Sequence, residues 1–268
     1  SFERAASRLL NDTLLEELCR PVDLDTLRDP GAPSDIAAIL YSGGTTGLPK
    51  QVPHTNAAII ATMERGDWGW RTNDAEIWLP VAPFTHIYGF LMGLTNPLIN
   101  AGAAVIPERF QPDLIVEMLA EENVTIFGGG PPAIYQAVMA SSKFHDAKFP
   151  ELRICPGGGA PFPLDVHRRW QEATGLKIYE GYGMTEIAPI TINTERDGVK
   201  LGSAGKPVPD TIVEIVDLET GSRVLETGEA GEIRVKGPHM MTGYTCSREE
   251  TAQAMRHGFV YTGDIGTI

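Results

Sequence analysis

The sequence has little positive charge for its length. Its 268 residues carry 22 Lys and Arg against 35 Asp and Glu, which gives a formal net charge of −13. An acidic chain repels polyanions unless a local basic cluster offsets the charge, and the sequence has no such cluster. We therefore expect neither nucleic acid nor an anionic membrane surface as a partner.

Cysteines and long apolar runs are also scarce. The three cysteines, Cys19, Cys155 and Cys246, are far apart and have neither CxxC nor Cys/His metal-binding spacing. This favours a reducing compartment without structural zinc. The most apolar stretch, residues 90–106, is interrupted by polar residues and proline, and falls short of the roughly 20 residues that a membrane span needs. We expect a cytoplasmic protein without a transmembrane segment.

The sequence shows no secretory leader and no initiator methionine. We interpret Ser1 as a cut within a longer protein.

What the chain does contain is an alternation of short apolar runs with amphipathic segments. Strands are expected at 36–41, 76–80, 103–106, 125–127, 152–155 and 177–179, and helices at 56–65, 88–96, 113–122, 133–141 and 163–174. Such alternation predicts an α/β fold with a mainly parallel sheet and helices on both faces. The strand at 36–41 is expected to be buried.

Beyond about residue 200 the pattern becomes that of short strands. Residues 211–217 and 231–237 alternate apolar and polar side chains and are separated by Thr-Gly turns. This predicts a small antiparallel β-barrel-like subdomain or meander. We therefore divide the chain into an approach helix (9–18) and linker at 1–35, an α/β part at 36–199 and a β-rich part at 200–268.

Residues 41–50 read Tyr-Ser-Gly-Gly-Thr-Thr-Gly-Leu-Pro-Lys. Glycine lets the backbone approach an anion closely, hydroxyl and N–H groups donate hydrogen bonds, and Lys50 adds a positive charge. The segment is not a Walker loop, because Lys50 lies between Pro49 and Gln51. The composition favours phosphate binding, with a surface turn as the structural alternative.

Two further segments place acids beside expected strand ends. Residues 179–186 read Tyr-Glu-Gly-Tyr-Gly-Met-Thr-Glu, which differs from a dinucleotide fingerprint because Glu186 replaces the last glycine. Thr185 and Glu186 suit a phosphate contact and a magnesium contact, respectively. Residues 261–264 read Tyr-Thr-Gly-Asp, and Asp264 suits two ribose hydroxyls. Polar turns are the alternative for both segments.

Two other segments suit flat or apolar ligands. Residues 157–161, Gly-Gly-Gly-Ala-Pro, leave a slot in which a planar ring fits. Residues 83–89, Pro-Phe-Thr-His-Ile-Tyr-Gly, place His86 between two aromatic residues. A lone histidine in such a setting is more often a packed core residue, so its functional interpretation depends on the other segments.

Together, in this order and at these spacings, the motifs resemble the AMP-forming acyl-CoA synthetase and adenylate-forming ligase superfamily, from about Ile36 to Ile268. The resemblance implies the following sites. The ATP phosphates contact Ser42, Gly43, Gly44, Thr45, Thr46, Gly47 and Lys50, with Thr185 on the α-phosphate and Glu186 on Mg²⁺. Adenine lies between Gly158, Gly159, Ala160 and Pro161 on one side and Glu180, Gly181, Tyr182 and Gly183 on the other, and Asp264 binds ribose. The acyl pocket is gated and lined by Phe84, His86, Tyr88 and Gly89, and Arg109 contacts CoA phosphate.

The implied chemistry is activation of a carboxylic acid, fatty or otherwise hydrophobic, to acyl-AMP with release of pyrophosphate, followed by transfer to the CoA thiol. Lys50, Thr185, Glu186 and His86 are the implied catalytic residues. The sequence departs from the family pattern at Gln51, where a glycine is usual, and at the pair Thr55-Asn56, where Thr-His is common.

The chain stops before the family's C-terminal lysine domain, so we expect impaired activity. The alternatives are an aryl-acid or carrier-protein adenylating enzyme, and a noncatalytic nucleotide-binding module.

Overall fold

The computed structural model describes residues 31–43, 49–66, 69–70 and 72–268. The predicted helix at 9–18 and loop residues Gly44, Thr45, Thr46 and Gly47 lie outside the described residues. Residues 34–268 form one compact unit, and residues 1–33 are a separate unit. Everything described below belongs to the larger unit.

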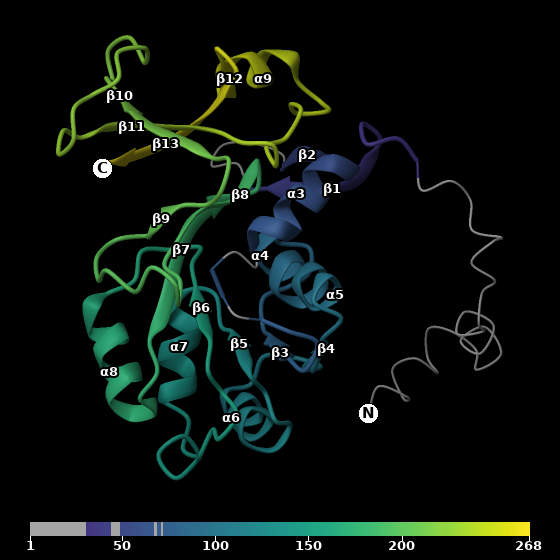
Figure 1. The fold of residues 1–268 in the computed structure, drawn as a ribbon, viewed down its shortest axis with the longest axis vertical. Helices are drawn as coiled ribbons and strands as arrows, with labels where there is room; N and C mark the ends of the chain where they lie inside the picture. Colours follow the sequence, from purple (N-terminus) through teal and green to yellow (C-terminus); the bar gives the residue numbers. More distant parts are fainter. Residues whose placement is uncertain (1–30, 44–48, 67–68, 71) are drawn as a thin grey trace. The chain divides into compact units, whose positions relative to one another are not determined.

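The larger unit is built on a parallel sheet, as the sequence predicts (Figure 1). Strands β3 (Ile77–Pro80), β4 (Ala103–Ala104) and β5 (Ile126–Gly128) pair in the order β4-β3-β5. Two isolated parallel bridges, Ile126 to Ile154 and Gly130 to Gly157, connect this sheet to strand β6 (Cys155–Gly157). β6 in turn pairs in parallel with β7 (Ile178–Met184). The observed β6 lies a few residues later than the predicted strand at 152–155.

Helices cover both faces of this sheet, because successive side chains of a strand point to opposite sides. Leu79 and Phe127 pack with helices α6 (Pro112–Glu121), α7 (Pro132–Met139) and α8 (Leu164–Thr174). Their neighbours Trp78 and Ile126 pack with the helical segment that follows β3. The α/β class and the covering of both faces are thus confirmed.

That helical segment is longer than predicted. It consists of α4 (Ile87–Phe90), a π-helical turn η2 (Leu91–Thr95) and α5 (Asn96–Ile99). Pro97 lies in the first turn of α5, directly after the π-helical turn. The predicted helix at 56–65 is observed as α3 (Asn56–Gly66).

The strand at 36–41 was expected to be buried, and this expectation was wrong. It forms β1 (Ile36–Ser42), which pairs antiparallel with β2 (Lys50–Thr55) in a two-stranded sheet. Only Leu40 of β1 is buried, whereas Val52, Pro53 and His54 of β2 are. The apolar run therefore forms one strand of an antiparallel pair and not a central strand.

The segment after β7 also differs from the prediction. β7 continues through Met184 and pairs antiparallel with β8 (Ile187–Ile192), which was not predicted, and β8 pairs with β9 (Lys206–Pro207). The sheet that contains β8 thus includes residues beyond 200. The division of the chain near residue 200 stays a prediction.

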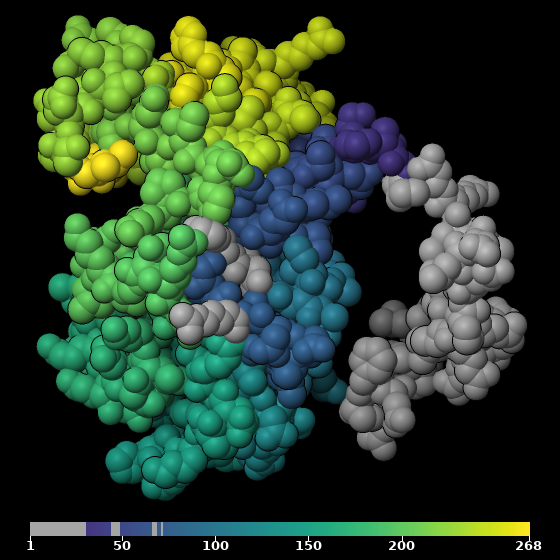
Figure 2. All heavy atoms as spheres, in the orientation of Figure 1, coloured from purple at the N-terminus to yellow at the C-terminus, as the bar shows by residue number. Residues whose placement is uncertain are grey.

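The C-terminal part forms an antiparallel sheet, as predicted. Strands β10 (Ile212–Val216), β11 (Gly231–Lys236), β12 (Met255–Arg256) and β13 (Phe259–Gly266) pair in the order β10-β11-β13-β12, and helix α9 (Arg248–Ala254) precedes β12. Ile187 and Ile190 of β8 pack against Val235 and Val260 of this sheet. In the space-filling view the blue atoms of β2 and α3 lie against the yellow-green atoms near α9 (Figure 2).

Candidate active site

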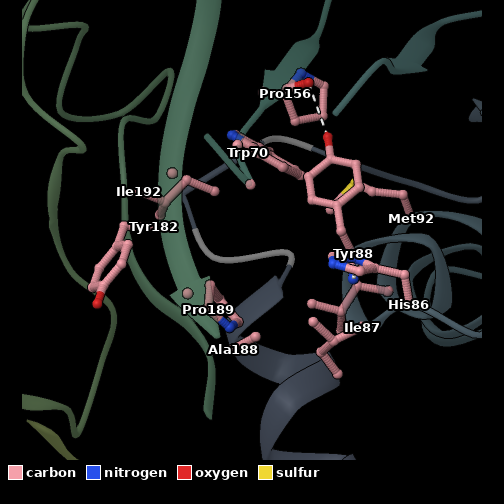
Figure 3. A pocket seen from close by; sticks show the side chains of 16 residues that line it. Trp70, His86, Ile87, Tyr88, Met92, Pro156, Tyr182, Ala188, Pro189 and Ile192 are labelled. Carbon is pink, nitrogen blue, oxygen red and sulfur yellow. Dashed lines mark hydrogen bonds between the residues drawn. The ribbon is translucent and has the colours of Figure 1, made fainter. Parts of the chain in front are cut away.

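A pocket brings three of the predicted segments together (Figure 3). It encloses about 570 Å³, counting the open space at its mouth. Residues 86–88, 157–159 and 181–183 all contribute to its wall. The remaining lining residues are Trp70, Leu91, Met92, Pro156, Ala188, Pro189 and Ile192. A concave site with mainly apolar walls and a few polar groups is typical of small-molecule binding.

Tyr88 is fixed to the wall of this pocket. Its hydroxyl donates to the carbonyl of Pro156 at 3.0 Å and accepts the N–H of Gly130 at 3.2 Å. The hydroxyl of Tyr135 donates to the same carbonyl at 2.7 Å. Burial raises the pKa of Tyr88, so its phenol stays protonated and keeps its role as a donor. The hydroxyl of Tyr88 is therefore fixed, and its ring presents an apolar surface to the pocket.

His86 begins helix α4 as its N-cap. Its Nδ1 accepts the N–H of Tyr88 at 3.1 Å, which places the proton of the neutral ring on Nε2. Desolvation lowers the pKa of His86, so the ring is neutral at neutral pH. The ring stands at the edge of the pocket, where it is partly exposed and partly desolvated. This arrangement offers an Nε2–H donor at the pocket wall.

Phe84 and Gly89 pack beside this turn and are not among the described residues that line the pocket. A Cβ on Gly89 would lie 2.1 Å from the carbonyl oxygen of Pro83, so the close turn before α4 requires glycine. A Cβ on Gly93 would lie 2.0 Å from the ring of Phe84. The structure thus gives both residues a packing role, and their contact with substrate stays a prediction.

The glycine segment after β6 keeps its backbone close to β7. Gly158 is buried, and a Cβ there would lie 2.8 Å from the carbonyl oxygen of Gly181. Gly159 has φ +82, and Ala160 and Pro161 are exposed. Gly158 thus packs directly against the backbone of β7, and a planar ring held between residues 158–161 and 180–183 stays a prediction.

Glu180 points away from this slot. Its carboxylate accepts the N–H of Phe162 at 3.3 Å and lies 3.3 Å from Nε2 of His167 on α8. These contacts anchor β7 to α8. Any contact of Glu180 with adenine is therefore through its backbone.

Thr185 and Glu186 form the turn between β7 and β8 and are buried. Oε1 of Glu186 accepts the hydroxyl of Tyr244 at 2.7 Å. The carbonyl of Thr185 lies 2.9 Å from Nε2 of His54 in β2, the atom that donates to it. The turn is thus held by the hairpin on one side and by residues after β11 on the other.

Lys50 begins β2, directly opposite Ser42 in the hairpin register. Its Nζ lies 3.2 Å from Oε1 of Glu250 and 4.9 Å from the ring centroid of Tyr244. Lys50 and Glu186, which are far apart in the sequence, thus contact the same tyrosine.

Asp264 lies where β13 bulges. Glu232 and Arg234 of β11 pair with Ile265 and Tyr261, so β13 has two extra residues between these pairs, and Gly263 has φ +76. The bulge brings Oδ2 of Asp264 within 2.6 Å of the hydroxyl of Tyr182, which donates to it. Desolvation and this hydrogen bond raise the pKa of Tyr182. The predicted ribose contact is therefore joined to the pocket through Tyr182.

Arg109 stands apart from this arrangement. It is exposed in the connection between β4 and α6, and among the described residues no hydrogen bond or ion pair joins it to the pocket. Its contact with CoA stays a prediction.

The residues that sequence reasoning missed include Trp70, His54 and Tyr244. None lies in a glycine-rich or acidic motif, and each is brought to the site by contacts distant in the sequence. Only the Gly-Tyr pair at 243–244, in a turn after β11, gave a weak local signal.

The carboxylate of Glu186 suits a Mg²⁺ ion that binds together with nucleotide phosphates. Among the described residues no cluster of three or more His, Cys, Asp or Glu side chains forms a metal cage. Mg²⁺ is commonly held by one or two carboxylates together with substrate phosphates and water. The hydrogen bond from Tyr244 engages one carboxylate oxygen of Glu186.

No helix in the described part of the chain has the length and hydropathy of a membrane span.

Comparison with known proteins gives one family. The family profile described as AMP-binding enzyme matches residues 5–245. The long-chain-fatty-acid–CoA ligase of Bacillus subtilis (strain 168) is 36% identical over 236 residues, covering 87% of this chain and 42% of the relative. The benzoate–CoA ligase of Thauera aromatica is 33% identical over 239 residues, covering 88% and 45%. The chain thus spans less than half the length of these relatives.

Solved structures agree. The crystal structure of ATP-bound MatB from Rhodopseudomonas palustris matches with a TM-score of 0.82 and 31% identity, covering 89% of this chain and 47% of that one. The motif resemblance, the fold and the pocket at the predicted segments all lead to the same assignment. The chain belongs to the family of AMP-binding enzymes, within the adenylate-forming ligase superfamily.

Proposed function

We propose that the chain is the nucleotide- and acyl-binding part of a ligase that activates a hydrophobic carboxylic acid with ATP. The whole protein would form an acyl-adenylate, release pyrophosphate and pass the acyl group to the thiol of CoA, or of a carrier protein. The observation that carries this proposal is the pocket in which residues 86–88, 157–159 and 181–183 meet. Tyr182, which lines this pocket, donates a hydrogen bond to Asp264.

The lining supports a hydrophobic acid. Trp70, Leu91, Met92 and Ile192 contribute apolar surface, and His86 is the one titratable imidazole among the described lining residues. Because its ring is neutral, the pocket offers a donor without burying a charge. A fatty acyl chain and an aromatic acid both satisfy these conditions, and relatives named for each class support keeping both in the test.

In the proposed reaction a carboxylate oxygen of the substrate attacks the α-phosphorus of ATP, and pyrophosphate leaves. Carboxylate and triphosphate repel each other, so cationic and hydrogen-bond-donating groups must offset their charge. Lys50 and Thr185 would supply an ammonium and a hydroxyl, and Glu186 would hold Mg²⁺. When bound, Mg²⁺ offsets negative charge on the phosphates. Asp264 would accept hydrogen bonds from ribose.

Thermal unfolding with non-hydrolysable acyl-adenylates tests this proposal. Short, medium, long and aromatic acyl groups are compared, and the matching acyl group raises the unfolding temperature most. A ligand at about one hundred times its Kd adds roughly 2.7 kcal/mol to the free energy of unfolding. The acyl group with the largest shift identifies the substrate class.

The controls are two lysine variants. Lys50→Ala weakens the shift, because the positive charge beside the phosphate end is lost. Lys143→Ala keeps it, because Lys143 pairs with Glu117, which lies on α6 and away from the pocket. The proposal fails if no adenylate shifts the wild-type chain, or if both variants weaken the shift equally.

A further inference from the structure

Tyr244 contacts both of the charged groups proposed for the phosphate end of the site. We propose that Tyr244 is a positioning residue, whose hydroxyl orients the carboxylate of Glu186 while its ring face seats the ammonium of Lys50. This inference rests on the proposed function and adds to it a residue outside the recognised motifs. One side chain would then set the separation between the metal-holding acid and the phosphate-facing cation.

The acid side of the contact is buried. Glu186 is 4% exposed, and the hydroxyl of Tyr244 donates to its Oε1 at 2.7 Å. A buried carboxylate needs donors, and a hydrogen bond to an ionised group is stronger than one between neutral groups. The backbone carbonyl of Glu186 also accepts the N–H of Met241 at 2.8 Å. The segment that carries Tyr244 thus holds Glu186 by both side chain and backbone.

The cation side is more open. Nζ of Lys50 lies 4.9 Å from the ring centroid of Tyr244, within the range of a cation–π contact. Its other partner is Glu250, at 3.2 Å, with a side chain that is 41% exposed. An exposed ion pair holds a lysine weakly, because water screens the charges. The ring of Tyr244 and the carboxylate of Glu250 therefore both direct Lys50.

Tyr244 is itself held in place from two sides. Its N–H donates to Oγ1 of Thr251 on α9 at 2.9 Å, and the next N–H, of Thr245, donates to the carbonyl of Gln51 at 3.2 Å. Gly243 has φ +129, and a Cβ there would lie 2.7 Å from the methyl of Thr251. A tyrosine fixed in this way can hold its two partners in a preorganised arrangement.

A double-mutant cycle without any ligand tests the contact with the acid. Tyr244→Phe and Glu186→Met each lower the unfolding temperature, since methionine has a similar length but no oxygen that accepts the hydroxyl of Tyr244. The double variant lowers it by less than the sum, because the two changes remove the same hydrogen bond. Strictly additive effects would overturn the inference and leave the proposed function standing.

Calorimetric binding of α,β-methylene-ATP, with and without MgCl₂, tests the positioning role. Loss of an outer contact to a metal-holding carboxylate weakens metal affinity by about tenfold or more, so Tyr244→Phe raises the Kd about tenfold with Mg²⁺. It changes the Kd less than about twofold without Mg²⁺, because the ring that faces Lys50 remains. Tyr244→Leu raises the Kd under both conditions.

The matched control is Ser222→Ala, which removes an exposed hydroxyl from the turn between β10 and β11, outside the described pocket lining, and leaves both Kd values unchanged. A Tyr244→Phe variant with equal effects in the presence and absence of Mg²⁺, or with no effect, would show that Tyr244 does not position Glu186. A wild-type chain that binds no nucleotide would overturn the proposed function and this inference together.

Discussion

Replacing Trp170 with alanine is expected to lower the free energy of unfolding by about 3–5 kcal/mol. The indole of Trp170 is fully buried on α8 and contacts three aromatic rings: Phe127 at 5.9 Å, Tyr135 at 4.9 Å and Phe144 at 5.8 Å between centroids. Removing it leaves a cavity that these rings cannot fill without moving. Because whole domains are stable by only about 5–15 kcal/mol, the loss is a large fraction of the total.

Urea unfolding measures this effect, with Leu164→Ala as the matched control on the same helix. Leu164 is 57% exposed, so its truncation costs no more than about 0.5 kcal/mol. Trp170→Phe falls between the two, since it keeps part of the ring contact. Equal losses for Trp170→Ala and Leu164→Ala would contradict the core described here.

The effect reaches the pocket through Tyr135. The ring of Tyr135 packs edge-on against Trp170, and its hydroxyl holds the carbonyl of Pro156 on the pocket wall. We therefore expect Trp170→Ala to weaken acyl-adenylate binding as well, while Leu164→Ala does not.

Much of the fold was predictable because local patterns agreed with tertiary packing. The helices α6 and α8 follow amphipathic repeats, and both begin within two residues of the predicted start. The strands β3 and β5 are continuous apolar runs, since both of their faces are covered. In such segments the sequence pattern and the buried face carry the same information.

Strand β8 was not predicted because Pro189 lies within it, and proline argues against an interior strand. The structure shows how the strand accommodates it. Tyr182 and Met184 of β7 pair with Thr191 and Ile187, so β8 bulges over the residues between these two pairs. A proline at a bulge loses no regular ladder hydrogen bond. Strand β1 was misjudged for a different reason, because an apolar run does not reveal whether its faces are covered.

The candidate site also has a part that could be predicted from the sequence and a part that could not. Asp264, Tyr182, Lys50 and Glu186 could be named from local motifs, because glycine, hydroxyl and acid residues cluster around them. Which of these residues pair, and with which residues outside the motifs, could not be predicted. The contact between Tyr182 and Asp264 spans 82 positions, and the contact between Tyr244 and Glu186 spans 58. Such pairs depend on the register of strands and on turns far apart in the chain, which no local pattern encodes.

The second large effect is a loss of stability at acidic pH, which we expect to come from His239. This residue is fully buried, and its Nε2 lies 2.7 Å from the carbonyl oxygen of Pro189, to which it donates. Desolvation by burial is the main cause that lowers the pKa of His239 from 6.5 to about 4. Because Pro189 lines the pocket, the neutral ring supports the pocket wall.

The sign of the pH effect follows from proton binding. Between pH 6.5 and about 4 the unfolded chain binds a proton at this histidine and the folded chain does not, so the free energy of unfolding falls as pH falls. At about 1.4 kcal/mol per pKa unit, the loss over this range is about 3 kcal/mol. His54 adds to it in the same direction, since burial also lowers its pKa.

Urea unfolding between pH 7.5 and 4.5 isolates this contribution when wild type is compared with His239→Gln. Glutamine can still donate to Pro189 but does not titrate, so the variant loses less stability between pH 6.5 and 4.5 than the wild type does. His145→Gln is the matched control, because His145 is exposed, and it keeps the wild-type pH dependence. Parallel pH profiles for the wild type and His239→Gln would mean that His239 is not held neutral in the fold. In that case the support of Pro189 would not depend on the charge state of the ring.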